Sequence, residues 1–347
     1  MENRCAPEPR HHSTTRKRKT IDTGDDRDPL SGSTVAQVGE FSVIARSLAG
    51  RVQSRNTVLG PGDDAAVVSA PDGRMVVTTD MLVQGRHFRL DWSDPEDVGR
   101  KAVAQNGADI AAMGARCTGF LVAIGCPSET PVEVTDALSE GLWREAVRAG
   151  ASIVGGDLVM TDSLVISITA LGDLEGRGPV LRSGARSGDV VAVAGKLGWS
   201  AAGLDLLLAG RSGYSALVAA HRVPTPDYEQ GIVAARSGAT SLTDVSDGLV
   251  ADLGHIAQAS SVTIDLDSGS FDIADEIASA ALDLDVSPLS WILGGGEDHA
   301  FAGTFPSDDV VPEGWSVVGR VSANGGDAVT VDGREFSGHA GWSSFQA

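Results

Sequence analysis

The sequence predicts an α+β protein with two domains. Its 347 residues are enough to bury two hydrophobic cores, and 42% of them are apolar. Short apolar runs typical of strands alternate with longer stretches of helical periodicity, and 43 glycines indicate many tight turns. No apolar run reaches the length of about 18 residues that a membrane span needs, so we expect no membrane partner.

Residues 1–34 are polar, with a basic run at 16–19 and an acidic stretch at 22–28, and they lack apolar periodicity. We expect a disordered N-terminal extension here. Because no apolar segment follows the basic residues, we predict no secretory signal and a cytoplasmic location.

The first domain is predicted over residues 35–175 and begins with a helix near 38–48. Residues 64–80 indicate a hairpin with a turn at Asp72–Gly73 and with Asp80 at the end of its second strand. Asp94 followed by Pro95 predicts the start of a helix that runs to about Met113. Further elements are expected as a strand at 119–126, a helix from Thr130–Pro131 to about Gly150, and strands at 152–157 and 163–174.

The second domain is predicted over residues 176–347 and follows a Gly- and Ser-rich joint at 182–189. Its expected elements are a strand at 189–195, a helix at 200–210, a strand leading into a helix at 241–260, and strands at 262–267, 299–306 and 315–322. Two mixed α+β domains of similar size are the expected architecture.

The formal net charge of -20 argues against a nucleic-acid partner, because such a partner requires a positive surface. The charge suits metal ions or a cationic ligand, although an acidic surface that only keeps the protein soluble explains it equally well. Cys5, Cys117 and Cys126 are an odd number without CxxC spacing, so neither a disulfide framework nor a zinc site is expected.

Aspartates recur next to apolar strands. Asp63 and Asp64 precede a predicted strand, and Asp109 lies in an Ala-rich helix, where a charge is costly unless it is paired. Lys101, eight residues earlier, is too far along the helix to reach Asp109. We expect these carboxylates to face one crevice together with the other aspartates at strand or turn positions, which are Asp80, Asp157, Asp244 and Asp247.

Scattered aspartates without clustered His or Cys favour a site for several magnesium ions and phosphate groups. The sequence has no GxxxxGK[ST] loop, no kinase HRD or DFG motif and no GxGxxG after a strand. Metal, rather than a Gly-rich loop, would therefore hold the phosphates.

Each of these residues also has a structural explanation. Asp247 could be a helix N-cap, and Asp63 could be a turn residue after Pro-Gly. Residues 294–298 could be a flexible loop, and His87 a structural histidine. A solvated acidic surface, however, does not predict aspartates that repeatedly accompany apolar strands.

Eight motifs between residues 38 and 345 resemble the thiamine-monophosphate kinase family, of the aminoimidazole-ribonucleotide synthase-like superfamily. They are GEFSVIA, GPGDDAAVV, VTTDMLVQGRHF, KAVAQNGADIAAMGA, IVGGD, LRSGARSGD, DVSDGLVADLGHI and LGGGEDHAF. The resemblance implies a homodimer whose first domains pair in a shared β-barrel, with an α+β second domain over the site. It implies Mg²⁺ as cofactor, ATP as co-substrate and thiamine phosphate as acceptor.

The resemblance also implies roles for individual residues. Asp80, Asp109 and Arg182 correspond to catalytic positions, and direct in-line transfer of the γ-phosphoryl group is the implied reaction. The implied magnesium ligands are Asp64, Thr78, Thr79, Asp80, Asp109, Asp157, Asp244 and Asp247. The implied nucleotide contacts are Gly156, Asp157, Arg182 and Ser246, and the implied thiamine-phosphate contacts are His87, Glu297 and Trp342.

The chain departs from the family pattern at Ala108, where a hydroxyl residue is common, and at His299 and Ala300, where an aromatic and an acidic residue are common. We expect these departures to leave the metal ligands untouched.

A selenide-activating enzyme would need a reactive Cys near a Gly-rich segment, whereas Cys5 lies in a Pro-containing tail. A hydrogenase-maturation enzyme would need a C-terminal Cys, but the chain ends in SSFQA, and a non-catalytic magnesium–nucleotide sensor is a third alternative.

Overall fold

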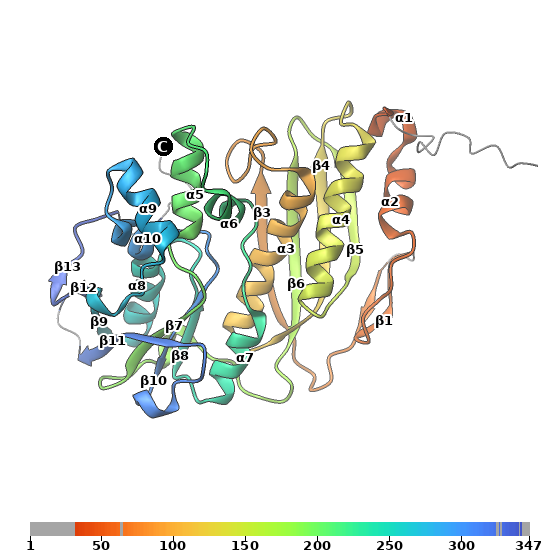
Figure 1. Ribbon diagram of the computed structural model, residues 1–347. Helices are drawn as coiled ribbons and strands as arrows, with labels where there is room; N and C mark the ends of the chain where they lie inside the picture. Colours follow the sequence, from red (N-terminus) through yellow and green to blue (C-terminus); the bar gives the residue numbers. More distant parts are fainter. Residues whose placement is uncertain (1–31, 63–64, 324–325, 327, 340, 342–347) are drawn as a thin grey trace, which may run out of the picture.

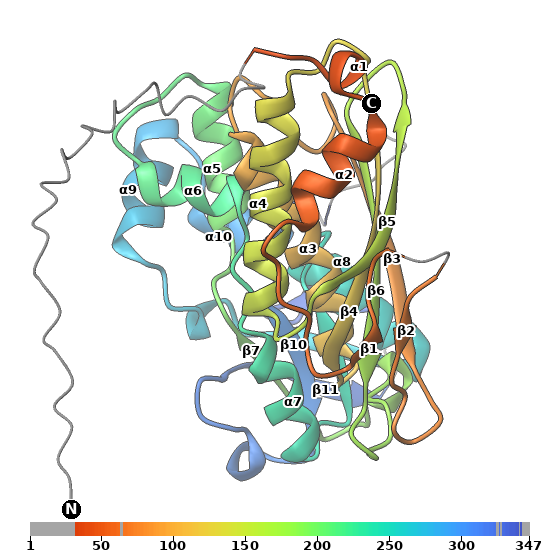
Figure 2. The ribbon, with the colours of Figure 1, turned by 90° about the vertical axis from the view of Figure 1, so that its right-hand side faces the viewer.

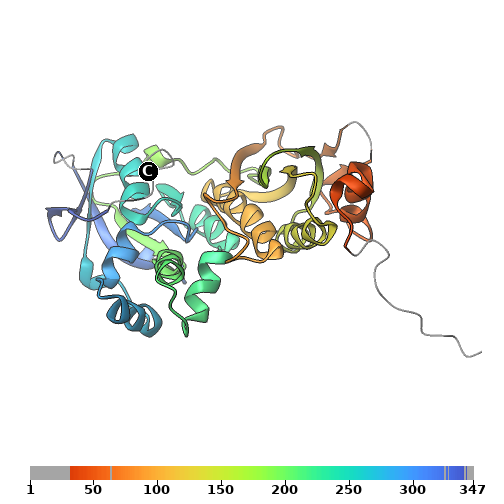
Figure 3. The ribbon, with the colours of Figure 1, turned by 90° about the horizontal axis from the view of Figure 1, so that it is seen from above.

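The computed structural model describes residues 32–62, 65–323, 326, 328–339 and 341. Asp63, Asp64, Trp342 and most of the predicted N-terminal extension lie outside these residues. The described chain forms a mixed α+β fold in which a four-stranded and a seven-stranded sheet, each with its own helices, lie side by side (Figures 1 and 3). No helix among the described residues has the length and apolar character needed to cross a membrane.

The first half of the chain contains both helices and strands. Its helices are α1 (Val35–Val38), α2 (Glu40–Leu48), α3 (Pro95–Ala112) and α4 (Val132–Arg148). Its strands are β1 (Thr57–Leu59), β2 (Val67–Val68), β3 (Val76–Val83), β4 (Arg116–Cys126), β5 (Ile153–Met160) and β6 (Val165–Asp173). The predicted start of α3 at Pro95 is confirmed, because Asp94 and Pro95 fix it locally.

The predicted hairpin at 64–80 is wrong. Within the described residues β2 pairs with β1, while β3 joins a four-stranded sheet in the order β3-β6-β4-β5. The turn at Asp72–Gly73 is present, but the strands on its two sides enter different sheets. Asp80 also does not end its strand, because β3 continues to Val83.

Helices α3 and α4 cover one face of this sheet (Figure 2). They approach closely because two glycines lie at their contact: a Cβ on Gly99 would be 2.2 Å from the Leu138 carbonyl oxygen, and one on Gly141 would be 1.9 Å from that of Glu96. The predicted helix at 38–48 is present as α2, yet Phe41 of its apolar stripe is 81% exposed.

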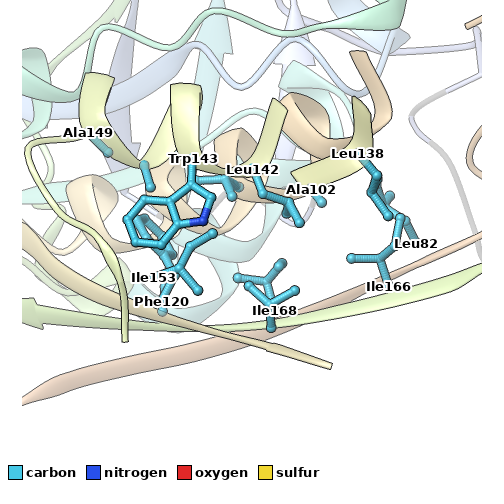
Figure 4. Packing of buried hydrophobic residues seen from close by; sticks show 14 of the residues in the cluster. Leu82, Ala102, Phe120, Leu138, Leu142, Trp143, Ala149, Ile153, Ile166 and Ile168 are labelled. Atoms are coloured by element: carbon cyan, nitrogen blue, oxygen red, sulfur yellow. The ribbon is translucent and has the colours of Figure 1, made fainter. Parts of the chain in front are cut away.

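A compact apolar core lies between these helices and the sheet. Figure 4 shows Leu138, Leu142 and Trp143 of α4 packed above Phe120 and Ile168 of the strands. Burying a side chain of this size contributes about 1.5–3 kcal/mol, so this layer fixes the position of α4 on the sheet.

The second half of the chain contains more helices than the sequence predicted. Its helices are α5 (Trp199–Leu208), α6 (Ser215–Arg222), α7 (Tyr228–Arg236), α8 (Leu249–Ser260), α9 (Asp275–Leu284) and α10 (Pro288–Gly294), with short 3-10 turns η1 (Arg182–Gly184), η2 (Ser268–Ser270) and η3 (Asp308–Val310). Its strands are β7 (Val190–Ala194), β8 (Ser241–Asp244), β9 (Val262–Leu266), β10 (Phe301–Phe305), β11 (Ser316–Ala323), β12 (Val329–Val331) and β13 (Arg334–Glu335). The five strands predicted in this half are confirmed as β7 to β11, whereas α6, α7, α9 and α10 were not predicted.

The strands of the second half form one sheet in the order β13-β12-β9-β11-β7-β10-β8 among the described residues. All neighbouring pairs are antiparallel except β12 and β9. The edge strand β8 contacts α3 of the first half, and α7 contacts α3 as well. Helix α3 is therefore a main element of the contact between the two halves.

Candidate active site

Four aspartates that the sequence singled out lie where the two halves meet. Asp80 lies in β3 and Asp109 in the last turn of α3, while Asp244 ends β8 and Asp247 lies in the turn before α8. Burial, followed by the charges of Asp244 and Asp80, raises the pKa of Asp109 to about 7. Burial also raises the pKa of Asp80, with Asp244 and Asp247 adding to it and His299 opposing it. These four residues are called the aspartate cluster below.

Hydrogen bonds between β3 and α3 fix one side of the cluster. Thr78 and Asp80 project from the same face of β3, because alternate residues of a strand share a face. Thr78 Oγ1 donates to Asp109 Oδ2 at 2.8 Å, and the backbone N–H of Asp80 donates to Asn106 Oδ1 at 2.9 Å. Asp109 is thereby held beside Asp80.

The other side of the cluster is held by Asp252, which the sequence analysis missed. Asp252 Oδ2 accepts the backbone N–H groups of Ser246, Asp247 and Gly248, each at 3.0 Å. Burial and the nearby Asp244 raise the pKa of Asp252 to about 7, against the effect of these donors. An acidic residue four positions after Gly248, in the first turn of α8, was the available sequence signal.

His299 contacts the aspartate cluster directly. Its Nδ1 lies 2.9 Å from Asp244 Oδ2, and both side chains are buried. Burial lowers the pKa of His299, but the hydrogen bond and the charge of Asp244 outweigh it and raise the pKa overall. The expectation that this departure from the family pattern leaves the metal ligands untouched is therefore wrong, because the residue that replaces the aromatic one bonds to a member of the cluster.

Three consecutive residues before β10 are each anchored to a different element. Glu297 Oε1 pairs with Lys101 Nζ of α3 at 2.8 Å, and Asp298 accepts the backbone N–H groups of Gly198 and Ser200 at the start of α5. His299 reaches Asp244, as described above. Glu297 and His299 have positive φ angles of 63° and 52°, a strained conformation that these contacts maintain. The segment thus joins α3, α5 and β8.

His87 lies in the turn after β3 in a defined tautomeric state. The backbone N–H of Val83 donates to His87 Nδ1 at 3.0 Å, so Nδ1 acts as acceptor and the ring can donate from Nε2. The carbonyl oxygen of His87 lies 3.1 Å from Lys101 Nζ. His87 and Glu297, both implied as acceptor contacts, are thus bonded to the same lysine.

Two of the implied magnesium ligands lie away from the aspartate cluster. Thr79 projects from the face of the sheet opposite to Asp80, and its Oγ1 donates to the Ile168 carbonyl oxygen at 2.8 Å. Strand register places Asp157 on the same face as Thr79. The structure does not bring these two side chains to the cluster, and their metal contacts stay predictions. We call this side of the sheet the open face.

A cavity with a volume of about 1140 Å³ borders the open face and lies against α2 and α4. Gly156 and Asp157, two implied nucleotide contacts, line it together with Ser139 and Trp143. The other implied nucleotide contacts lie near the aspartate cluster. Ser246 is in the turn that Asp252 holds, and the charge of Arg182 in η1 acts on Asp247.

The aspartate cluster fits divalent cations that prefer oxygen ligands. Its donors are carboxylates, with the Thr78 hydroxyl adjacent, which is the set that Mg²⁺ favours. Burial raises the pKa of Asp109 to about 7, the charges of Asp244 and Asp80 add to this, and His299 opposes it. A bound divalent cation would neutralise the charge of these neighbouring carboxylates, so the residues fit Mg²⁺.

Comparison with known proteins agrees with this geometry. The family model for the N-terminal domain of AIR synthase related proteins matches residues 62–174. The matched segment contains β3 and α3, with Asp80 and Asp109. Residues 62–174 are thus similar to the N-terminal domain of AIR synthase related proteins, and this class is consistent with the fold and the site.

Individual relatives narrow the class further. A thiamine-monophosphate kinase of Mycobacterium tuberculosis is 55% identical over 313 residues, which cover 90% of this chain and 93% of that protein. The crystal structure of thiamine-monophosphate kinase from Stenotrophomonas maltophilia K279a matches with a TM-score of 0.73 and 31% identity, covering 85% of this chain and 95% of that one. The structure of AaThiL complexed with AMPPCP and TMP matches with the same TM-score and identity, covering 88% of this chain and 97% of that one. The chain belongs to the thiamine-monophosphate kinase family and is an enzyme of the kinase class.

Proposed function

We propose that the protein transfers the γ-phosphoryl group of ATP directly to thiamine phosphate, giving thiamine diphosphate and ADP. The observation that carries the proposal is the aspartate cluster. Helix α3 and strand β8 bring its members together, beside the segment 297–299. The match to AaThiL complexed with AMPPCP and TMP supports both substrates.

Asp64, Thr78, Asp80, Asp109, Asp244 and Asp247 would hold magnesium near the reacting phosphates. Thr79 and Asp157 project from the opposite face of the sheet, so they would hold a separate ion there. Bound Mg²⁺ would neutralise phosphate charge and stabilise the charge of the transition state. The protein's own contribution is to keep the carboxylates converged, which the hydrogen bonds of Thr78, Asn106 and Asp252 support. Asp80 and Asp109 are the proposed catalytic carboxylates of this set.

The nucleophile would be a phosphate oxygen of thiamine phosphate. This oxygen is already anionic at neutral pH, so the reaction needs no strong general base, and the main task is to align two anions. His87 can donate from Nε2, and Glu297 offers a carboxylate that suits the positively charged thiazolium ring. Trp342 would place an aromatic face near that ring.

The nucleotide would contact Gly156 and Asp157, which line the cavity beside the open face. Arg182 would add planar guanidinium donors to the ATP phosphates, and Ser246 would contribute from the turn that carries Asp247. In this assignment, the phosphates that react lie at the aspartate cluster.

We also propose that residues 35–175 act as one domain, residues 176–347 as another, and that two copies of the first domain pair in a shared β-barrel. Apolar side chains on the open face support a buried partner: Val77, Met81, Leu121 and Val159 are 39–58% exposed in the single chain. Size-exclusion chromatography with light scattering tests the dimer, which a monomer at micromolar concentration would contradict.

The reaction is tested by incubating the purified protein with ATP, Mg²⁺ and thiamine phosphate and separating the products by chromatography. We expect thiamine diphosphate and ADP in equal amounts and no phosphorylation of thiamine itself. Nucleotide binding without either product would favour the non-catalytic sensor. ATP consumption that depends on selenide or on a hydrogenase-maturation partner would favour the other two alternatives.

A further inference from the structure

Lys101 is buried at the contact between the two halves of the chain. Its side chain is 2% exposed, and its Nζ lies 2.8 Å from Glu297 Oε1 and 3.1 Å from the carbonyl oxygen of His87. The carbonyl oxygen of His221, at the end of α6, is 3.5 Å away. One ammonium group thus joins the turn after β3, the end of α6 and the segment before β10.

A buried ammonium group costs several kcal/mol unless it is paired and hydrogen-bonded, so these contacts hold Lys101 tightly. Its partner is less enclosed: the Glu297 side chain is 32% exposed. His221 Nδ1 lies 3.6 Å from Glu297 Oε2, but burial and the charge of Lys101 lower the pKa of His221 to about 4, so it is neutral near pH 7. Lys101 therefore neutralises Glu297 from the protein side, while the carboxylate keeps an accessible side.

Lys101 and Asp109 lie on the same helix, eight residues apart. At about 1.5 Å per residue, α3 separates them by about 12 Å along its axis. Asp109 belongs to the proposed phosphate-binding end of the site, and Lys101 fixes Glu297 and the His87 turn at the other end. A rigid helix therefore sets the spacing between the groups proposed to contact the two ends of the acceptor.

We propose that Lys101 is a positioning residue for the phosphate acceptor, which holds Glu297 and the His87 turn at a fixed distance from each other and from the aspartate cluster. This inference rests on the proposed function, because it takes thiamine phosphate as the acceptor at His87 and Glu297. Lys101 acts through these two residues and not by contact with the substrate.

The test compares Lys101→Met, Lys101→Arg and Glu297→Gln with the wild-type protein in steady-state kinetics. We expect Lys101→Met to raise the KM for thiamine phosphate about tenfold or more and to change the KM for ATP less than about twofold. Lys101→Arg keeps the charge but cannot match the two short contacts, so we expect an increase of about three- to tenfold in the same KM. Lys196→Met removes the charge of a more exposed lysine that lies over the ring of Trp199, and it should leave both KM values unchanged.

The double variant Lys101→Met/Glu297→Gln distinguishes positioning from a general structural role. If Lys101 acts through Glu297, the double variant should have nearly the same KM for thiamine phosphate as Glu297→Gln alone. Equal increases in the KM values for ATP and thiamine phosphate would overturn the proposal, as would a native acceptor KM in both Lys101 variants. If Lys101→Met does not fold, the KM of Lys101→Arg for thiamine phosphate tests the proposal instead. If neither variant folds, Lys101 has a structural role and the proposal is overturned. If the wild-type protein forms no thiamine diphosphate, the proposed function fails first and this inference with it.

Discussion

The ring of His299 bonds to the carboxylate of Asp244 at 2.9 Å, inside the aspartate cluster. A histidine at this position supplies a proton, and when protonated a positive charge, to a site that otherwise consists of carboxylates. Burial and then the charges of Asp244 and Asp80 raise the pKa of Asp109 to about 7, and His299 opposes this rise. A bound divalent cation would add positive charge to these carboxylates.

Replacing Asp109 with Asn should strongly reduce turnover without unfolding the protein. The amide is nearly isosteric and can still accept the hydrogen bond from Thr78, but it removes one negative charge from the cluster. We expect kcat/KM to fall about 100-fold or more, which corresponds to about 3 kcal/mol of transition-state stabilisation. The measurement is product formation at millimolar Mg²⁺, with circular dichroism as the check on folding.

The matched control for this variant is Asp272→Asn, which makes the same chemical change at an exposed position outside the cluster. It should retain the wild-type rate. A near-native rate for Asp109→Asn would mean that Asp109 does not hold a catalytic cation.

The stability of the metal-free protein should fall as the pH rises from about 4 to about 7. The folded pKa of Asp109 is about 7, whereas its ordinary value is 3.8, so the folded state binds the proton more tightly than the unfolded state does. Stability decreases with pH wherever the folded state holds more protons, and the effect of one such group is on the order of 2–4 kcal/mol. Urea unfolding in EDTA, repeated across this pH range, measures it.

Asp252 and Asp298 also have pKa values raised to about 7 and contribute in the same direction. The difference between the wild type and Asp109→Asn in how the free energy of unfolding changes with pH isolates the contribution of Asp109. We expect a smaller loss of stability in the variant, and Mg²⁺ should stabilise the wild type more than the variant. If the free energy of unfolding in EDTA changed with pH in the same way for both proteins, the raised pKa of Asp109 would be contradicted.

Local sequence signals predicted the elements that carry the site, but not how they meet. Asp94 and Pro95 fix the start of α3, and the segment that runs from Ser241 into the apolar residues after Gly248 predicts a strand followed by a helix, because both signals depend on neighbouring residues. The pairing of β2 with β1 rather than β3 depends on contacts that the turn at Asp72–Gly73 cannot encode.

The same limit applies to the residues that sequence reasoning missed. Lys101 and Glu297 are far apart in the chain, and although the resemblance implied Glu297 as an acceptor contact, nothing in the sequence indicated that Lys101 pairs with it. Asp298 and Asp252 act by accepting backbone N–H groups, a role that depends on the path of the chain and not on a motif. The convergence of Asp80, Asp109 and Asp244 was predicted because aspartates at strand and turn positions were expected to face one crevice, but the bond from His299 was not predicted.

Replacing Asp252 with Ala should destabilise the protein and weaken nucleotide binding together. The substitution leaves the N–H groups of Ser246, Asp247 and Gly248 without their acceptor. Each buried donor left without a partner costs about 1–3 kcal/mol, although water will restore part of this. We expect a loss of about 2–3 kcal/mol in the free energy of unfolding. The KM for ATP should also increase, because the turn carries Ser246 and Asp247.

Asp267→Ala provides the comparison, because Asp267 likewise accepts a backbone N–H group, from Gly269, in a turn outside the cluster. It should cost about 0.5–1 kcal/mol and leave the KM for ATP unchanged. If Asp252→Ala lowered stability without any change in this KM, the turn would not take part in nucleotide binding.

Replacing Gly141 with Ala should separate α3 from α4. A Cβ at this position would lie 1.9 Å from the carbonyl oxygen of Glu96 and 3.0 Å from the backbone nitrogen of Arg100, so the backbone of α3 must move. Overpacking of this kind costs about 1–3 kcal/mol or more, and we also expect lower activity because α3 carries Asp109.

Gly254→Ala is the matched control, since Gly254 lies inside α8 with open space where a Cβ would lie. This variant should gain about 0.5–1 kcal/mol in the free energy of unfolding. Urea unfolding of both variants measures the contrast, and a Gly141→Ala protein as stable as wild type would show that the contact between α3 and α4 does not fix the position of α3.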